Sequence, residues 1–191
     1  MEVDWEFEVG GGAPVIDALW AGFVDLRRQP ERLGEIGEVV GFPALGKLLA
    51  ALNAPTSPQW TAKCDTWEPE TEGWAEAACY VDLLPRDGLL FRLPEEAEGF
   101  CRRWTARLEP VELADCQVEL VVRLALAGPI EGFGVTAYLS AKGRGRDETA
   151  RALAAVLLEF QKTIPGSDES RVPESLLPST IKKRGASSSI G

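Results

Sequence analysis

Histidine is missing from all 191 residues of the chain. Its absence excludes Ser-His-Asp and Cys-His catalysis, most zinc and non-haem iron centres, and any histidine-based pH switch. Carboxylate pairs, a lysine or cysteine nucleophile and all-oxygen Mg²⁺ or Ca²⁺ sites remain open. The composition therefore favours a protein that is not an enzyme and has no metal or other cofactor, while leaving a carboxylate-dependent enzyme open.

Long apolar runs and a basic leader are missing as well. No stretch approaches the roughly 18 consecutive apolar residues of a membrane-spanning helix. The chain opens on the acidic Met1-Glu2-Val3-Asp4, where a secretory signal would be basic. We therefore expect a cytoplasmic protein with no membrane contact.

Paired cysteine motifs are also absent. The four cysteines are Cys64, Cys79, Cys101 and Cys116, and no two of them have the C-x-x-C spacing of zinc ribbons or redox motifs. In a cytoplasmic protein such cysteines stay reduced and act as small buried apolar residues. We expect all four to be buried thiols.

Charge is plentiful but mostly of one sign. The 20 Lys and Arg residues against 30 Asp and Glu residues give a net charge of −10. An acidic surface repels a phosphate backbone, so we expect no nucleic-acid partner. The last segment, residues 166–191, is basic and rich in serine and has no periodic apolar pattern. It is predicted to be a flexible C-terminal tail that follows a single domain over residues 1–165.

Three segments have the apolar spacing of amphipathic helices: residues 43–53, 94–108 and a stretch from about 147 to 164. Residues 16–26 and 30–40 also show helical spacing, although Gly34 and Gly37 weaken the second of these.

Strand patterns lie between the helices. Alternation is strongest over residues 117–126 and 134–141, and it recurs around residues 60–66, 78–84 and 5–9. A helix followed by a hairpin thus occurs twice, which suggests two αββ units. We predict an α+β domain with an antiparallel sheet of four or five strands and helices packed on one face.

The other face of this sheet is the first candidate site. If Trp60, Cys64, Val118, Leu120 and Val135 face the helices, alternation places aromatic and charged residues on the uncovered side. These residues are Lys63, Asp65, Trp67, Tyr80, Asp82, Glu119, Arg123 and Tyr138. Aromatic side chains among charges of both signs are typical of a surface that binds a protein partner. A merely solvated sheet face is the simpler interpretation.

Two further segments are candidates. The loop with Lys142, Arg144 and Arg146 precedes a helix and has the charge of an anion-binding loop, or else is a solvated connection. The basic run Lys182, Lys183 and Arg184 in the tail has the character of a mobile contact for a partner, or else only keeps the chain soluble.

The sequence thus predicts a non-enzymatic interaction or adaptor domain that binds a protein partner through the open sheet face and the tail. The alternative is a domain that binds a small molecule or anion on the same face. In that alternative Asp65, Asp82 and Glu119 would run a hydrolase or transferase reaction, or hold a divalent cation, unless Lys63 and Arg123 neutralise them. The oligomeric state is left open.

Overall fold

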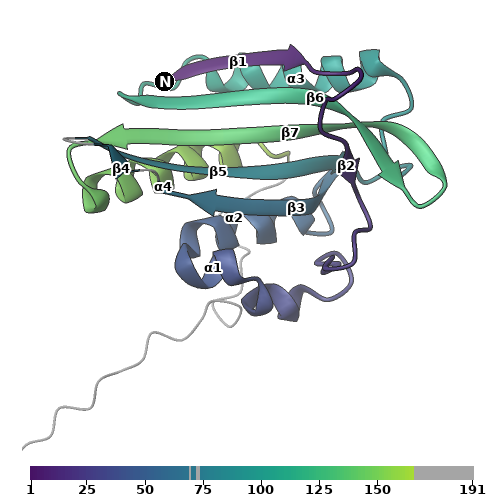
Figure 1. Cartoon of the computed structure of the whole chain (residues 1–191), viewed down its shortest axis with the longest axis horizontal. Helices are drawn as coiled ribbons and strands as arrows, with labels where there is room; N and C mark the ends of the chain where they lie inside the picture. The colour runs from purple at the N-terminus through teal and green to yellow at the C-terminus, as the bar shows by residue number, and fades with distance from the viewer. Residues whose placement is uncertain (69, 72–73, 166–191) are drawn as a thin grey trace, which may run out of the picture.

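The computed structural model describes residues 1–68, 70–71 and 74–165 (Figure 1). The strands are β1 (Glu2–Phe7), β2 (Ile16–Asp17), β3 (Gln59–Trp67), β4 (Glu70–Thr71), β5 (Trp74–Pro85), β6 (Cys116–Ala127) and β7 (Ile130–Gly143). The helices are η1 (Pro30–Glu35), α1 (Gly37–Gly41), α2 (Pro43–Asn53), α3 (Pro94–Leu108) and α4 (Arg146–Lys162). The predicted tail, with Lys182, Lys183 and Arg184, lies outside the described residues.

The three long helices confirm the sequence prediction. In α2, Pro43 occupies the first turn, where its missing N–H costs no hydrogen bond, and the leucines share one buried face. In α3, the Glu96 carboxylate accepts hydrogen bonds from the backbone N–H groups of Arg92 and Leu93, and Arg107 lies in the last turn. Caps and charges therefore agree with the apolar pattern at both ends.

The sheet is mixed and has seven strands in the described part, in the order β1-β6-β7-β5-β3, with β2 on β6 and β4 on β5. The prediction of a purely antiparallel sheet of four or five strands was wrong in both respects. The long strands β3, β5, β6 and β7 do pair antiparallel. Strands β1 and β2 instead run parallel to β6, one after the other along its free edge. The pairing of these two strands could not be predicted from hairpin signals, because no tight turn connects β1 to its partner β6.

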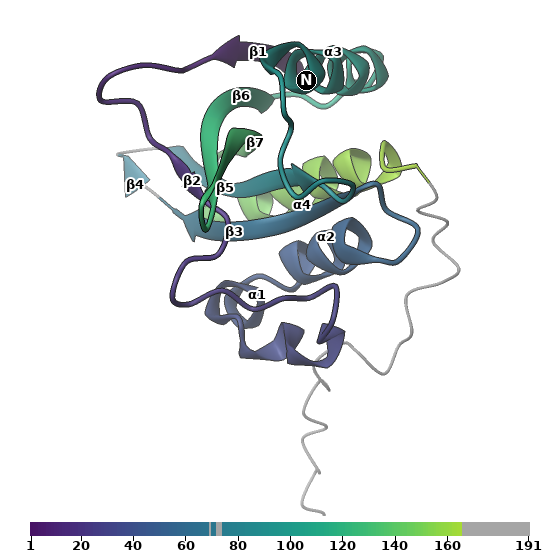
Figure 2. The ribbon, with the colours of Figure 1, turned by 90° about the vertical axis from the view of Figure 1, so that its right-hand side faces the viewer.

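Helices α2, α3 and α4 pack on one face of the sheet (Figure 2). The alternate residues of β5, β6 and β7 that face them form one buried apolar cluster with Trp104 and Phe160. The rings of these two aromatic residues are 4.6 Å apart at 63°. Burial of this face supplies the main hydrophobic stabilisation of the fold. No helix in the described residues has both the length and the apolarity needed to cross a membrane.

The segment after β1 overturns another expectation. Residues 16–26, predicted as a helix, form β2 and turns that cross the second face of the sheet. Ile16 and Ala18 are buried there, and the Trp20 indole Nε1–H donates a hydrogen bond to the Ala62 carbonyl at 3.1 Å. These long-range contacts outweigh the local helical spacing. The next region, residues 30–40, divides into η1 and α1 at the extended residue Ile36.

A β-bulge in β3 changes which residues face the helices. The register with β5 shifts between Thr61 and Cys64. Trp60 therefore packs with Ile16 under the crossing segment, whereas Cys64 packs against the helix-side core. The prediction that both residues face the helices was wrong for Trp60, because a bulge inserts one residue and breaks strict alternation.

Candidate binding surface on the open sheet face

One row of side chains runs across the sheet on the face away from the helices. The strand register places Asp4 of β1 beside Glu119 of β6, Glu119 beside Tyr138 of β7, Tyr138 beside Tyr80 of β5, and Tyr80 beside Asp65 of β3. Residues paired in register point to the same side of a sheet. With strands about 4.8 Å apart, this cross-strand row is about 19 Å long.

The centre of the cross-strand row belongs to an aromatic cluster of Trp67, Tyr80 and Tyr138. The ring centroids lie 5.9 Å apart for the two tyrosines, and 6.3 and 6.4 Å from Trp67 to Tyr80 and Tyr138. These distances and the tilted planes are those of attractive aromatic pairs. Trp67 is nevertheless 40% exposed. The cluster is therefore ordered by its own contacts and still accessible.

Carboxylates gather at the β1 side of this face. Asp4 and Glu6 are exposed on β1, and Glu119 is half-buried beside them. Burial raises the pKa of Glu119, and the neighbouring charges of Glu6 and Asp4 raise it further. Glu8, by contrast, accepts a hydrogen bond at 2.6 Å from Arg123. We call Asp4, Glu6 and Glu119 the acidic margin.

A pocket of about 320 Å³, lined by apolar and charged side chains, lies where the crossing segment meets the open face. Its lining comes from the crossing segment and from strands β3, β5, β6 and β7: Pro14, Val15, Ile16, Asp17, Trp20, Lys63, Tyr80, Asp82, Arg123 and Tyr138. A volume near 300 Å³ is at the lower end for small-molecule sites. The face is therefore covered at one end, hollowed in the middle and open at the aromatic cluster.

Asp82 is the buried charge of this pocket. It is 7% exposed, and its carboxylate accepts a hydrogen bond from the Thr136 hydroxyl at 2.7 Å. Burial raises its pKa from 3.8 to about 6, although Thr136, Arg123 and Lys63 act in the opposite direction. The hydrogen bond with Tyr80 raises the pKa of Lys63, which keeps that side chain cationic.

The three carboxylates considered for catalysis do not converge. Asp65 and Glu119 occupy the cross-strand row with both tyrosines between them, three strand spacings or about 14 Å apart. Asp82 lies two residues along β5 from Tyr80, beneath the pocket. No group of three or more acidic or thiol side chains that could hold a metal ion occurs among the described residues. The geometry gives little support to a carboxylate-run reaction here.

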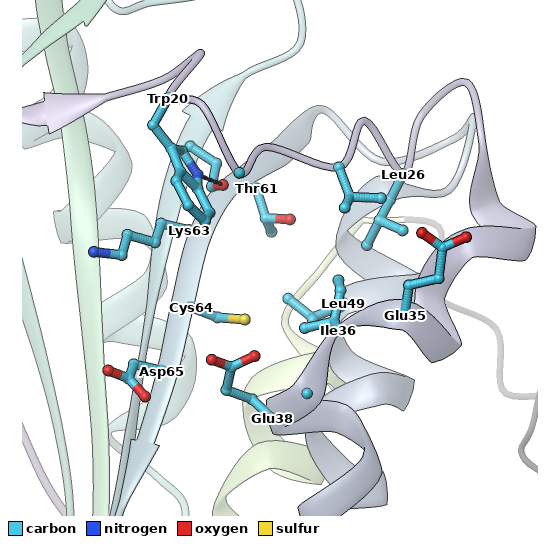
Figure 3. Close-up of a pocket in the computed structure, with 14 residues that line it drawn as sticks. Trp20, Leu26, Glu35, Ile36, Glu38, Leu49, Thr61, Lys63, Cys64 and Asp65 are labelled. Atoms are coloured by element: carbon cyan, nitrogen blue, oxygen red, sulfur yellow. Dashed lines mark hydrogen bonds between the residues drawn. The ribbon is translucent and has the colours of Figure 1, made fainter.

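A second hollow, of about 270 Å³, follows the outer side of β3 (Figure 3). Cys64 points into it toward the Glu38 carboxylate, whereas Lys63 and Asp65 point away toward the sheet face. Burial, with a smaller contribution from Glu38, raises the pKa of Cys64 to about 12. A thiol that stays protonated is a poor nucleophile, so this hollow has no activated cysteine.

The loop before α4, predicted as a candidate anion-binding loop, has acidic side chains beside its arginines. Arg144 and Arg146 lie around an open hollow with Asp147 and Glu148, and Lys142 is the last-but-one residue of strand β7. The Glu148 side chain accepts a hydrogen bond from the Arg144 backbone N–H at 3.2 Å. That carboxylate takes one of the donors an anion would need. An anion site at this loop stays a prediction.

All eight residues predicted for the open face occupy that side of the sheet, but they divide between two places. Trp67, Tyr80, Tyr138, Asp65 and Glu119 form the open part, whereas Lys63, Asp82 and Arg123 line the pocket with the two tyrosines.

Sequence reasoning missed the acidic margin on β1 and the crossing segment as a pocket wall. The signal for the margin was the acidic residue at every second position of β1. The missing information was the pairing of β1 with β6.

No protein-family model, no curated protein and no solved structure matches the chain.

Proposed function

We propose that this protein is a non-enzymatic binding protein that engages a protein partner through the open part of the sheet face. The aromatic cluster carries the proposal. Three rings in mutual contact, one of them a tryptophan that is 40% exposed, lie on a face that no helix of the described residues covers. Trp and Tyr dominate the binding energy of protein interfaces, because they bury large areas at a small entropic cost.

The surroundings of the cluster support this function. The tyrosines are half-buried, and each ring packs against its neighbours, so the contact surface is preorganised before a partner arrives. The carboxylates of the cross-strand row lie on either side of the rings and supply a polar rim. A central aromatic patch with a charged rim is the usual anatomy of a protein interface.

Site-specific crosslinking tests the proposal. A photoreactive phenylalanine analogue replaces Trp67 in the full chain, and the protein is irradiated in the cells that produce it. The matched control carries the same analogue at Leu158 of α4, which is also 40% exposed but lies on the helix side. We expect one defined crosslinked protein from position 67 and none of it from position 158. Identical products from both positions would refute the proposal.

A small polar molecule in the pocket is the second candidate function. The observation that favours it is the half-open pocket of about 320 Å³ between the crossing segment and the sheet, with Asp82, Lys63 and Arg123 on its lining. A screen of small metabolites by thermal shift tests this function. A ligand that stabilises the wild type but not Lys63→Ala would support it, whereas equal stabilisation of both proteins would place the ligand elsewhere.

A further inference from the structure

We infer that the partner segment lying on the cross-strand row is cationic, with arginine or lysine side chains over the tyrosine rings and against the acidic margin. The inference rests on the proposed function and adds the chemistry of the partner. It commits the open face to one occupant, a basic segment of another protein, and it follows from the arrangement of charges and rings across five strands.

The carboxylates of the acidic margin form no ion pair among the described residues, and Arg123 offsets only part of the charge at Glu119. No ion pair in the described part of the chain involves Asp4, Glu6 or Glu119, whereas Glu8 is paired with Arg123. The raised pKa of Glu119 reflects burial and the crowding of these carboxylates. An apolar partner would bury those charges unpaired, which is costly. A cationic partner would neutralise them.

The centre of the row already accommodates a guanidinium group. The Arg123 guanidinium lies 5.5 Å from the centroid of the Tyr138 ring, within the range of cation–π attraction. Trp67 and Tyr80 present further rings beside it. Aromatic faces that are partly exposed attract a second cation in the same way, and arginine stacks on them better than lysine.

The far end of the row repeats the pattern. Asp65 on β3 is exposed next to Tyr80, and Lys63 lies near both of these side chains. The row therefore reads carboxylate, carboxylate, tyrosine, tyrosine, carboxylate over about 19 Å. About six residues of extended chain span that length. A short segment with cations near both ends and in the middle complements it.

The test uses a synthetic peptide of eight arginines and, as its neutral counterpart of nearly equal shape, a peptide of eight citrullines. Binding to the full chain is measured by calorimetry at low and at physiological salt. The test variant is Asp4→Asn/Glu6→Gln/Glu119→Gln. The matched control Glu31→Gln/Glu95→Gln/Glu109→Gln removes the same number of charges at exposed positions in η1, in α3 and directly after α3, outside the row. Thermal melts establish that both variants are folded.

We expect the arginine peptide to bind and the citrulline peptide not to bind. The test variant should weaken binding about tenfold, at roughly a factor of two per surface charge pair, and the control variant less than twofold. Equal weakening by both variants would mean diffuse attraction to an acidic protein and would overturn the inference.

The two proposals fail in different ways. If the protein crosslinked at position 67 binds the test variant as tightly as the wild type, the cationic segment is refuted and the docking surface stands. If no defined protein crosslinks at position 67, the proposed function is refuted, whatever the peptides do.

Discussion

Replacing Asp82 by asparagine should make the protein more stable at neutral pH. The carboxylate is buried, and its pKa is about 6 against an ordinary value of 3.8. One pKa unit corresponds to about 1.4 kcal/mol, so ionised Asp82 costs the fold about 3 kcal/mol. Asparagine has the same shape, keeps an acceptor for the Thr136 hydroxyl and carries no charge. The free energy of unfolding of the Asp82→Asn variant should therefore exceed that of the wild type by close to this amount.

The sign of the pH dependence follows from the raised pKa. Between pH 4 and pH 6 the folded protein binds a proton at Asp82 that the unfolded chain does not, so this carboxyl contributes stability as the pH falls through that window. The wild type should therefore approach the Asp82→Asn variant in stability on acidification. Near pH 4 both side chains are neutral, and the difference between the two proteins should be small.

Urea unfolding at half-unit steps from pH 4 to pH 8 measures this difference directly, since other titrating groups cancel between wild type and variant. Thr136→Val is the companion variant. It removes the hydroxyl that favours the charged carboxylate, so it should raise the pKa of Asp82 further. A difference that stays constant over the pH range, or a variant less stable than wild type at pH 8, would refute the reasoning.

Three further predictions concern packing. Gly134→Ala should lower the free energy of unfolding in urea by about 1–3 kcal/mol, because a Cβ there would lie 2.8 Å from Ile16 Cδ1 and 2.7 Å from Leu84 Cδ2. The control Gly41→Ala places its Cβ within 4 Å of no other atom and should leave the stability unchanged. Trp104→Ala should lose about 3–5 kcal/mol in the same assay, since that side chain is buried and its ring packs on those of Phe100 and Phe160. The four thiols should react with a disulfide reagent at pH 8 far more slowly in the native protein than in urea, because burial raises the pKa of three of them to about 12. Equal reaction rates in the native and the unfolded protein would contradict the burial of these thiols.

The helices and the central hairpins could be predicted because their information is local. In α2 the apolar residues repeat at helical spacing between Pro43 and Asn53, and the structure has the same bounds. Strands β6 and β7 alternate over many residues and are joined by a short turn, so their pairing follows from the sequence alone. In each case the local pattern agrees with the tertiary contacts.

The rest depends on contacts between residues far apart in the chain. The parallel pairing of Asp4 with Glu119 joins positions 115 apart, and no turn signal connects them. The crossing segment resembles a helix by spacing, but Ile16 and Trp20 find partners on the sheet instead. The alternation along β5 predicts that Asp82 faces solvent, yet the crossing segment covers it. The sequence indicated the face, whereas its division into pocket and docking surface needed the structure.

The central claim is that the aromatic cluster on the open face is a docking surface. Its most direct test is the affinity of the protein crosslinked at position 67 for Tyr138→Ala, with Leu158→Ala as the control on the opposite side. The account predicts that Tyr138→Ala weakens this complex about tenfold or more while the control stays within twofold, both variants being folded. Unchanged affinity of the Tyr138→Ala variant would contradict it.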